Sequence, residues 1–440
     1  MSSPKNNLSR RDFLKIAGAG SAAATVYGLS GGRALASPAR QVNDVTATLN
    51  VFDFGSDKQL KIYADDAARF NKRFPNVTVK DELIAFPDGW GQYITILKAR
   101  FAGGNPPDIV AIAIEGARQT VQSDLMIPLD PYLDKDPAAK DMLSDVDKAL
   151  NDALKYQGKT YWATREWNNM CIHYNVQMFA DAKIAAPTKD WTWDKFLETA
   201  LKLTTGSGDS KIYGFGIPYF NFGLAPWWHT NGTSTLSPDW TASNLDDPKM
   251  LESVKFVSDL VNKHGVSPSV QGTDQFALFA AGRVAMTAAG HWPIAQWQDA
   301  KLNMDVQYWP RKTAGTTVFG SGGWGITKTC KNPDVAWELI KDLTSRENDR
   351  ALAAVGAAIP ARRSATDIPE FKAFPKNSDV FYGSLADIKP IPSPGNFAQV
   401  EEIFMRNLGA IMAKQVTPEQ GLEAAHKELA TAMADLKASS

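Results

Sequence analysis

Cysteine and histidine are scarce in this chain of 440 residues, and neither forms a pattern that holds a metal ion or a cluster. The two cysteines, Cys171 and Cys330, occur without a C-x-x-C pair. The five histidines form no H-E-x-x-H or H-x-H pattern. We therefore expect no metal ion and no other cofactor. We also expect two unpaired, buried thiols, although an oxidising compartment would allow them to pair.

Long runs of one residue type are also missing. The 47 lysines and arginines balance 48 acidic residues and form no basic cluster, which argues against nucleic acid as a partner. Beyond the first 36 residues, no apolar run is long enough to span a membrane. A chain of this length with 44% hydrophobic residues holds more than one core usually contains, so we expect two domains.

Short catalytic motifs are absent as well. There is no G-x-S-x-G nucleophile elbow and no Walker lysine. The stretch G-S-G-G-W-G, Gly320–Gly325, fits the dinucleotide pattern G-x-G-x-x-G, but β-favouring residues and a polar turn follow it where that motif requires a helix. We interpret it as a flexible backbone crossing. Paired carboxylates for glycoside cleavage need no local motif, so an exported carbohydrate-active enzyme remains an alternative.

What the N-terminus does contain is a cleavable export signal. Ser9–Lys15 is S-R-R-D-F-L-K, the twin-arginine consensus, and a weakly apolar stretch follows at Ile16–Leu29. Ala34–Ala36 is an A-x-A cleavage site, which makes Ser37 the first mature residue. Because no cysteine follows the small residues, we expect a free periplasmic protein without a lipid anchor.

Beyond residue 44, strand and helix patterns alternate. Apolar alternation predicts strands at 46–54 and 77–84, and 108–114 is an apolar strand. Apolar residues at helical spacing predict helices at 60–74, 93–101, 193–204, 248–263, 273–281, 333–344 and 418–437. Thr417 is the expected N-cap of the last helix. This alternation is typical of an α/β fold with a largely parallel sheet.

The tryptophans are unevenly placed: eleven of the thirteen lie between Trp162 and Trp324. Several are flanked by glycine, proline or asparagine, namely Trp90, Trp227, Trp228, Trp292 and Trp324. Tryptophans in such loop contexts often line ligand sites, whereas those in periodic segments usually pack in the core. We expect the set to form a shared aromatic cleft, although core packing is an equal alternative for each ring alone.

A series of short segments, taken in chain order, carries a resemblance to a known family. The segments are F-A-G-G-N-P-P-D-I-V at 101–110, L-M-I-P-L-D-P-Y-L at 125–133, G-K-T-Y-W at 158–162, H-Y-N at 173–175, T-W-D-K-F at 192–196, F-A-A-G-R-V-A-M at 279–286, G-H-W at 290–292, G-G-W-G-I-T at 322–327, N-P-D-V-A-W-E at 332–338 and G-A-A-I-P-A-R at 356–362. Together they resemble the family-1 extracellular solute-binding proteins of ABC importers, the maltose-binding-protein-like group. Thr164 departs from the pattern, because relatives often have proline there.

The resemblance implies an α/β, two-lobed periplasmic-binding-protein fold of type II, with hinge strands between the lobes. The implied division is a signal peptide at 1–36, a linker at 37–44, an N-lobe at 45–163 plus 321–357, a C-lobe at 168–317 plus 362–440, and hinge crossings at 164–167, 318–320 and 358–361. On this layout, the glycines of 320–325 let the backbone approach a ligand and absorb a hinge rotation.

The resemblance also implies a ligand site between the lobes. Aromatic rings can cover the apolar faces of a sugar, and carboxylates, amides or arginines can bind its hydroxyls. The residues at the matching positions are Phe54, Ser56, Asp57, Trp90, Glu115, Arg165, Glu166, Trp167, Asn168, Trp227, Trp228, His229, His291, Trp292, Gly322, Gly323, Trp324 and Arg362.

Several of these side chains also have a purely structural explanation. The alternatives are a helix N-cap for Asp57, an exposed loop carboxylate for Glu115, a mutual ion pair for Arg165 and Glu166, a turn residue for His291, and a helix-end cap for Arg362.

The implied function is capture of a mono- or oligosaccharide in the periplasm and its delivery to the permease subunits of an ABC importer in the inner membrane. The resemblance implies a monomer that catalyses no reaction. A polyol, a glycerophosphodiester or an anionic sugar remains an alternative ligand, because Arg165 and Arg362 could bind an acidic group.

Overall fold

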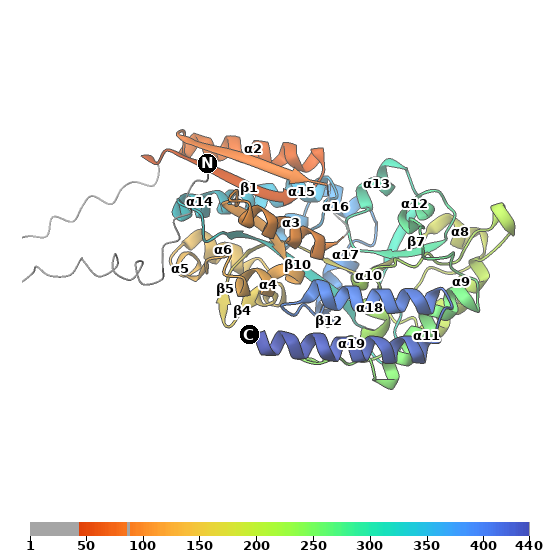
Figure 1. The fold of residues 1–440 in the computed structure, drawn as a ribbon. Coiled ribbons are helices and arrows are strands. Elements are labelled where there is room, and N and C mark those ends of the chain that lie inside the picture. The colour runs from red at the N-terminus through yellow and green to blue at the C-terminus, as the bar shows by residue number, and fades with distance from the viewer. Residues whose placement is uncertain (1–43, 86–88, 440) are drawn as a thin grey trace, which may run out of the picture. The chain divides into compact units, whose positions relative to one another are not determined.

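The computed structural model describes residues 44–85 and 89–439. The signal peptide, its cleavage site and most of the linker lie outside these residues. The described chain contains two principal β-sheets, and each is covered by its own helices (Figure 1). Within this part of the chain, no helix combines the length and the apolar character needed to cross a membrane.

The larger sheet has the strand order β11-β6-β10-β3-β1-β2, with β12 pairing to β10 as well. Its strands are β1 (Ala47–Phe54), β2 (Val77–Ile84), β3 (Ile109–Ala113), β6 (Ala163–Asn169), β10 (Thr317–Ile326), β11 (Ile359–Pro360) and β12 (Ile388–Pro390). The first three strands are mutually parallel, and β10 runs antiparallel to both β3 and β6. The larger sheet is therefore mixed, and the expectation of a largely parallel sheet is wrong, because β6 and β10 run antiparallel to their neighbours in this strand order.

The second sheet has the order β8-β7-β9 and is antiparallel. Its strands are β7 (Cys171–Asn175), β8 (Met286–Ala289) and β9 (Met304–Gln307), and a separate hairpin consists of β4 (Lys155–Tyr156) and β5 (Lys159–Thr160). Because β7 follows β6 after a single residue, Met170, one continuous extended segment passes from the first sheet into the second.

Helices fill the connections between the strands. They are α2 (Asp57–Arg73), α3 (Trp90–Ala102), α4 (Ile114–Gln122), α5 (Asp130–Leu133), α6 (Pro137–Ser144), α7 (Lys148–Ala153), α8 (Val176–Asp181), α9 (Trp193–Leu203), α10 (Asn221–Thr230), α11 (Pro248–Asn262), α12 (Gln275–Ala280), α13 (Ile294–Asp299), α14 (Pro333–Leu343), α15 (Arg346–Ala354), α16 (Pro369–Ala373), α17 (Asp379–Gly383), α18 (Phe397–Met412) and α19 (Pro418–Ser439). The two last helices pack on each other, and the N-terminal part of α18 lies against α3 and α4 (Figure 1).

The elements expected from the sequence are confirmed, with their ends shifted by a few residues. The Thr417 N-cap is also confirmed, because its Oγ1 accepts a hydrogen bond from the backbone N–H of Gln420 at 3.2 Å. The sequence patterns did not indicate α10, which contains Gly223 and Pro226 and is buried on nearly every side. A helix without a polar face shows no amphipathic period.

The crossing strands β6 and β10 are irregular at one point. Gly322 pairs with Glu166 and Gly323 pairs with Thr164, so Arg165 is an extra residue in the ladder, a β-bulge. Thr164 keeps the strand path without proline by donating from Oγ1 to Asn151 Oδ1 at 2.7 Å. The lobe boundaries that we predicted from the resemblance stay a prediction.

Both cysteines are free, as we expected. Cys171 is buried, whereas Cys330 is only partly buried. Burial raises the pKa of both thiols, to about 12 for Cys330. Both are therefore protonated, unreactive thiols at neutral pH.

Candidate ligand-binding site

The side chain of Arg165 is buried in the protein interior. It forms a buried ion pair with Asp53 of β1, and it donates to Glu166 at 2.8 Å and to the hydroxyl of Tyr63 at 3.2 Å. Its guanidinium also lies 4.7 Å from the ring centre of Trp324. Burial disfavours its charge, but the carboxylates of Asp53 and Glu166 outweigh this effect and raise the pKa of Arg165. The mutual pair with Glu166 that we considered is present, within a larger network.

Arg362 is held in a second ion-pair cluster. It pairs with Asp141 and with Asp145, the latter at 3.1 Å, and it donates to the carbonyl oxygen of Thr344 at 3.3 Å. Thr344 is the C-cap of α14. Of the two alternatives that the sequence left open, this geometry matches the helix-end cap.

Most of the predicted aromatic residues lie inside the cores, so the tryptophans do not form one shared cleft. Trp167, Trp227, Trp228 and Trp324 are at most 1% exposed. Trp227, for example, is enclosed by the rings of Trp193 and Trp309, with centroids 5.4 and 4.9 Å away. These rings leave no free face for a ligand in this conformation.

The predicted histidines are buried as well. Burial lowers the pKa of His229 and of His291 to about 3, with smaller contributions from Lys389 and His173 respectively, so both rings are neutral. His291 lies in the bend between β8 and α13, which is the turn position that we considered, and it stacks on Phe371 at 4.9 Å.

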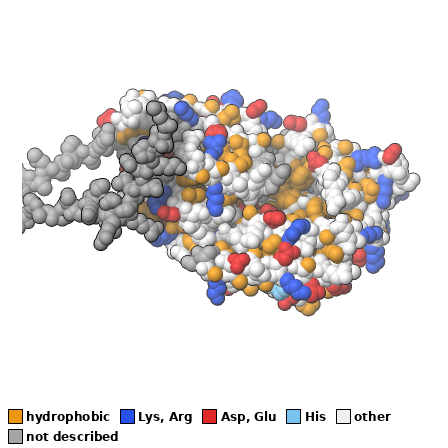
Figure 2. Space-filling view, viewed as in Figure 1, with side chains coloured by type: hydrophobic (Ala, Val, Ile, Leu, Met, Phe, Trp, Pro, Cys, Tyr) orange, Lys and Arg blue, Asp and Glu red, His pale blue; other side chains and the backbone are white. Residues whose placement is uncertain are grey.

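Two partly exposed groups of aromatic rings remain. On the N-lobe, Phe54 at the end of β1 packs edge-on against Trp90 at the start of α3, with centroids 5.0 Å apart. On the C-lobe, Trp292 lies near Phe220 and Phe222, at 6.2 and 6.4 Å. Figure 2 shows hydrophobic side chains gathered in a hollow near the middle of the molecular surface.

Gly320 of β10 connects the C-lobe rings to the N-lobe. A Cβ at this position would lie 3.2 Å from the ring of Phe222 and 3.6 Å from Glu115 Oε1. Gly323 is different, because a Cβ there would lie 2.7 Å from the carbonyl oxygen of Ala163. Gly320 therefore keeps space open beside Glu115, whereas Gly323 permits close packing of β10 on the chain beside it. Sequence reasoning did not single out Gly320 or Phe222 as ligand residues.

The crossing strand β6 brings two polar side chains to the same region. Glu166 is partly exposed, and its Cγ would lie 3.5 Å from a Cβ placed on Gly322. Asn168 is also partly exposed, and its Oδ1 accepts a hydrogen bond from the backbone N–H of His291 at 3.1 Å. This bond ties β6 to the loop that carries Trp292.

Glu115 is the most unusual group of the site. It lies in the first turn of α4 and is only 6% exposed, so the exposed-loop alternative is wrong. Its Oε2 has no hydrogen-bond partner. Burial raises the pKa of Glu115 from 4.5 to about 8, and repulsion from Glu401 of α18 adds to this shift. Burial likewise raises the pKa of Glu401 to about 7. Sequence reasoning gave no indication of Glu401.

Ser56 and Asp57 lie at the exposed N-terminus of α2. Ser56, and not Asp57, is the N-cap, and its backbone N–H donates to Gln59 Oε1 at 2.9 Å. The next residue, Lys58, pairs with Asp299 at the end of α13, with Nζ and Oδ2 3.5 Å apart. This exposed pair joins α2 to α13.

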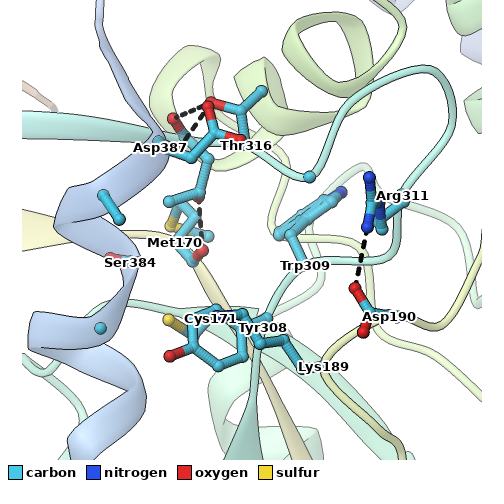
Figure 3. A pocket seen from close by; sticks show the side chains of 14 residues that line it. Met170, Cys171, Lys189, Asp190, Tyr308, Trp309, Arg311, Thr316, Ser384 and Asp387 are labelled. Atoms are coloured by element: carbon cyan, nitrogen blue, oxygen red, sulfur yellow. Dashed lines mark hydrogen bonds and ion pairs between the residues drawn. The ribbon is translucent and has the colours of Figure 1, made fainter.

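A separate cavity of about 190 Å³ lies beside the crossing strands, and Figure 3 shows its lining. Its walls include Trp309, Tyr308 and Arg311, and Arg311 pairs with Asp190 at 2.8 Å. Not one of the predicted ligand residues lines this cavity. The candidate site is therefore the interlobe region around Glu115 and Trp292.

Comparisons with known proteins identify the family of this chain. Residues 55–350, more than half of the sequence, match the family described as bacterial extracellular solute-binding protein. The chain belongs to this family. Residues 7–26 match the signal sequence of the twin-arginine translocation pathway. The export signal that we predicted is thereby confirmed, and the protein is located in the periplasm.

Solved structures confirm the two-lobed fold of this solute-binding protein. An ABC substrate-binding protein of Listeria monocytogenes, in complex with cycloalternan, has a TM-score of 0.80 at 24% identity and covers 89% of this chain and 100% of its own. A solute-binding protein from Thermotoga lettingae bound with α-D-tagatose has a TM-score of 0.77 at 20% identity, covering 88% and 100%. A maltose-bound protein of T. maritima has a TM-score of 0.75 at 19% identity, covering 87% and 99%.

A curated relative is a maltotriose-binding protein of Pyrococcus abyssi, which is 23% identical over 301 residues. The matched part spans 65% of this chain and 61% of that protein, which is less than two thirds of the relative's length.

The Arg165 network gives a prediction about stability. Arg165→Met leaves Asp53 buried without its cation, which we expect to lower the free energy of unfolding by about 3–5 kcal/mol. Urea denaturation of the mature protein measures this change. As a control, Arg406→Met removes an exposed pair with Glu428 and should cost less than about 1 kcal/mol. Equal, small losses in both variants would contradict the structural role of Arg165.

Glu115 gives a prediction about pH. Below pH 4.5 the carboxyl is protonated in both the folded and unfolded states. Between pH 4.5 and about 8 the unfolded chain releases this proton while the folded protein keeps it. Stability therefore falls with rising pH, by up to about 1.4 kcal/mol per pH unit. Glu115→Gln should make this decline shallower in urea denaturation from pH 5 to 8.

The matched control for this pH series is Glu402→Gln, which changes an exposed carboxyl next to Glu401. It should leave the decline unchanged. If the wild-type and Glu115→Gln proteins lose stability with the same slope, the buried carboxyl is not protonated in the folded protein and the prediction is wrong.

Proposed function

We propose that this solute-binding protein captures a carbohydrate, a mono- or oligosaccharide, between its lobes and delivers it to the permease subunits of an ABC importer. The carrying observation is that the described structure keeps the aromatic rings of Trp90 and Trp292 partly exposed and leaves Oε2 of the buried Glu115 carboxyl without a hydrogen-bond partner. Rings can cover the C–H faces of a sugar, and the carboxyl can accept hydrogen bonds from its hydroxyls. The sugar-bound structural relatives and the maltotriose-binding relative support this ligand class.

The proposed ligand set is narrower than the one implied by the sequence. It keeps Phe54, Trp90, Glu115, Glu166, Asn168 and Trp292, and it adds Phe222 and Gly320. Ser56 and Asp57 remain at its exposed edge. We assign a structural role, without ligand contact, to the other residues of the earlier set: the enclosed tryptophans and histidines, Gly322, Gly323, Arg165 and Arg362.

An anionic sugar or a glycerophosphodiester is a weaker candidate for the same importer. The two arginines that suggested such a ligand are both neutralised by aspartates. The acidic groups near the proposed site, Glu115 and Glu401, offer an anion no positive charge. A polyol keeps no charge and remains compatible with the site.

We propose that the protein changes conformation when its ligand binds and that it catalyses no reaction. The division of the chain into lobes, with crossings at 164–167, 318–320 and 358–361, lets ligand contacts to both lobes favour a closed state. We propose that the protein acts as a monomer. Light scattering measures the mass of the protein in solution and so tests whether it is a monomer. Incubation with a labelled oligosaccharide tests catalysis, because turnover of this compound would favour the alternative of an exported carbohydrate-active enzyme.

A thermal-shift assay of the mature protein, residues 37–440, against a panel of sugars tests the ligand class. A ligand that binds only the folded protein raises its melting temperature. We expect one sugar class to produce a concentration-dependent rise. If no saccharide and no polyol changes the melting temperature, the carbohydrate proposal fails.

Trp292 provides the matching test of the site. Removal of a ring that covers a sugar face costs about 1–3 kcal/mol, so Trp292→Ala should weaken binding of the identified sugar about 10- to 100-fold in titration calorimetry. The control is Tyr132→Ala, which removes a partly exposed ring that stacks on Trp337 at 5.5 Å, outside the site. Equal affinities in both variants would contradict the placement of the site.

A further inference from the structure

Two carboxyls without an ion-pair cation come from α4 and α18, two helices that pack against each other. Glu115 projects from α4 of the N-lobe, and Glu401 projects from α18 of the C-lobe. A Cβ on Gly89, the N-cap of α3, would lie 4.0 Å from Glu401 Oε2, which places this carboxyl near the N-terminus of α3. Among residues 44–85 and 89–439, neither carboxyl has an ion-pair partner.

The charged groups on the neighbouring elements are engaged elsewhere. Arg118, one turn after Glu115 on α4, lies over the ring of Trp240 at 4.2 Å. Arg100 of α3 pairs with Glu82, Lys155 of β4 pairs with Asp152, and Arg406 of α18 pairs with Glu428. Glu166 of β6 is paired with Arg165. Two further charged residues on these elements, Lys98 of α3 and Glu402 of α18, form no ion pair with Glu115 or Glu401.

Glu115 is therefore different from the other buried acids of the network around β6. Asp53 has Arg165 as its cation. Glu115 is only 6% exposed, and its Oε2 has no hydrogen-bond partner. Gly320 keeps the space next to Glu115 Oε1 free of a side chain. A buried carboxylate without a partner is costly, so a group that enters this space and compensates its charge gains binding energy.

We propose that the interlobe site selects a carbohydrate that carries a protonated amine, an amino sugar, whose ammonium group lies between Glu115 and Glu401. Glu115 keeps its proton in the free protein at pH 7. An ammonium group favours release of this proton because it compensates the resulting negative charge, whereas a neutral hydroxyl donates one hydrogen bond and compensates no charge. An ammonium donates three and compensates charge, and hydrogen bonds between charged groups are about twice as strong as neutral ones. The ring of Phe222 lies beside Gly320, next to Glu115, and can cover an apolar face of the sugar.

This inference rests on the proposed carbohydrate function and narrows its ligand class. It is tested by titration calorimetry of the mature protein at pH 7 with three matched sets: glucosamine, galactosamine and mannosamine, each beside its neutral parent and its N-acetyl form. The same comparison is made with the glucosamine disaccharide, cellobiose and diacetylchitobiose. N-acetylation removes the charge and retains the ring, so it separates charge from shape.

We expect at least one amino sugar to bind tenfold or more tightly than its neutral parent and its N-acetyl form, with a preference that falls as salt is added. Glu115→Gln should reduce this preference to about twofold or less. The control Glu402→Gln, at an exposed position outside the site, should retain the full preference.

The outcomes separate this inference from the function on which it rests. If neutral sugars bind as tightly as their amino forms, or if Glu115→Gln weakens both forms equally, the amino-sugar assignment is wrong and the carbohydrate function stands. If no saccharide binds in this set or in the wider panel, both fail.

Discussion

The buried ion pair between Arg165 and Asp53 is the interaction on which the site depends. It joins the crossing strand β6 to β1 one residue before β1 ends at Phe54. Burying two charges is costly, and the hydroxyl of Tyr63, the carboxylate of Glu166 and the ring of Trp324 offset this cost. The β-bulge at Arg165 turns this side chain inward while its neighbours keep their pairing with β10. The strand that leads into the C-lobe is thus fixed to the N-lobe sheet at one defined point.

The same interaction explains what the sequence could and could not predict. Strands and helices with a clear apolar period were predictable, and the ordered segments indicated the family and its two lobes. The pairing of Arg165 with Asp53 was not predictable, because Asp53 lies 112 positions away and no local pattern connects the two residues. Trp227 and Trp228 have loop-like neighbours but belong to α10, a helix enclosed on nearly every side, and only tertiary packing reveals this burial.

The candidate site also contains residues that sequence reasoning did not find. Gly320, Phe222 and Glu401 come from β10, α10 and α18, and only the fold brings them together around Glu115. Glycines within one motif also differ in role, since Gly320 leaves space while Gly323 allows strand and neighbour to touch. Residue type and flanking sequence therefore indicated candidate residues, whereas tertiary packing decided which of them are enclosed in the core.

The two free cysteines bear on how this protein reaches its compartment. A chain whose thiols are unpaired needs no oxidant to complete its fold, so folding can finish in the reducing cytoplasm. The twin-arginine route transports proteins that are already folded, and residues 7–26 carry its signal. Because the thiol of Cys171 is enclosed in the core and held protonated, the entry of the chain into an oxidising compartment leaves this thiol unpaired.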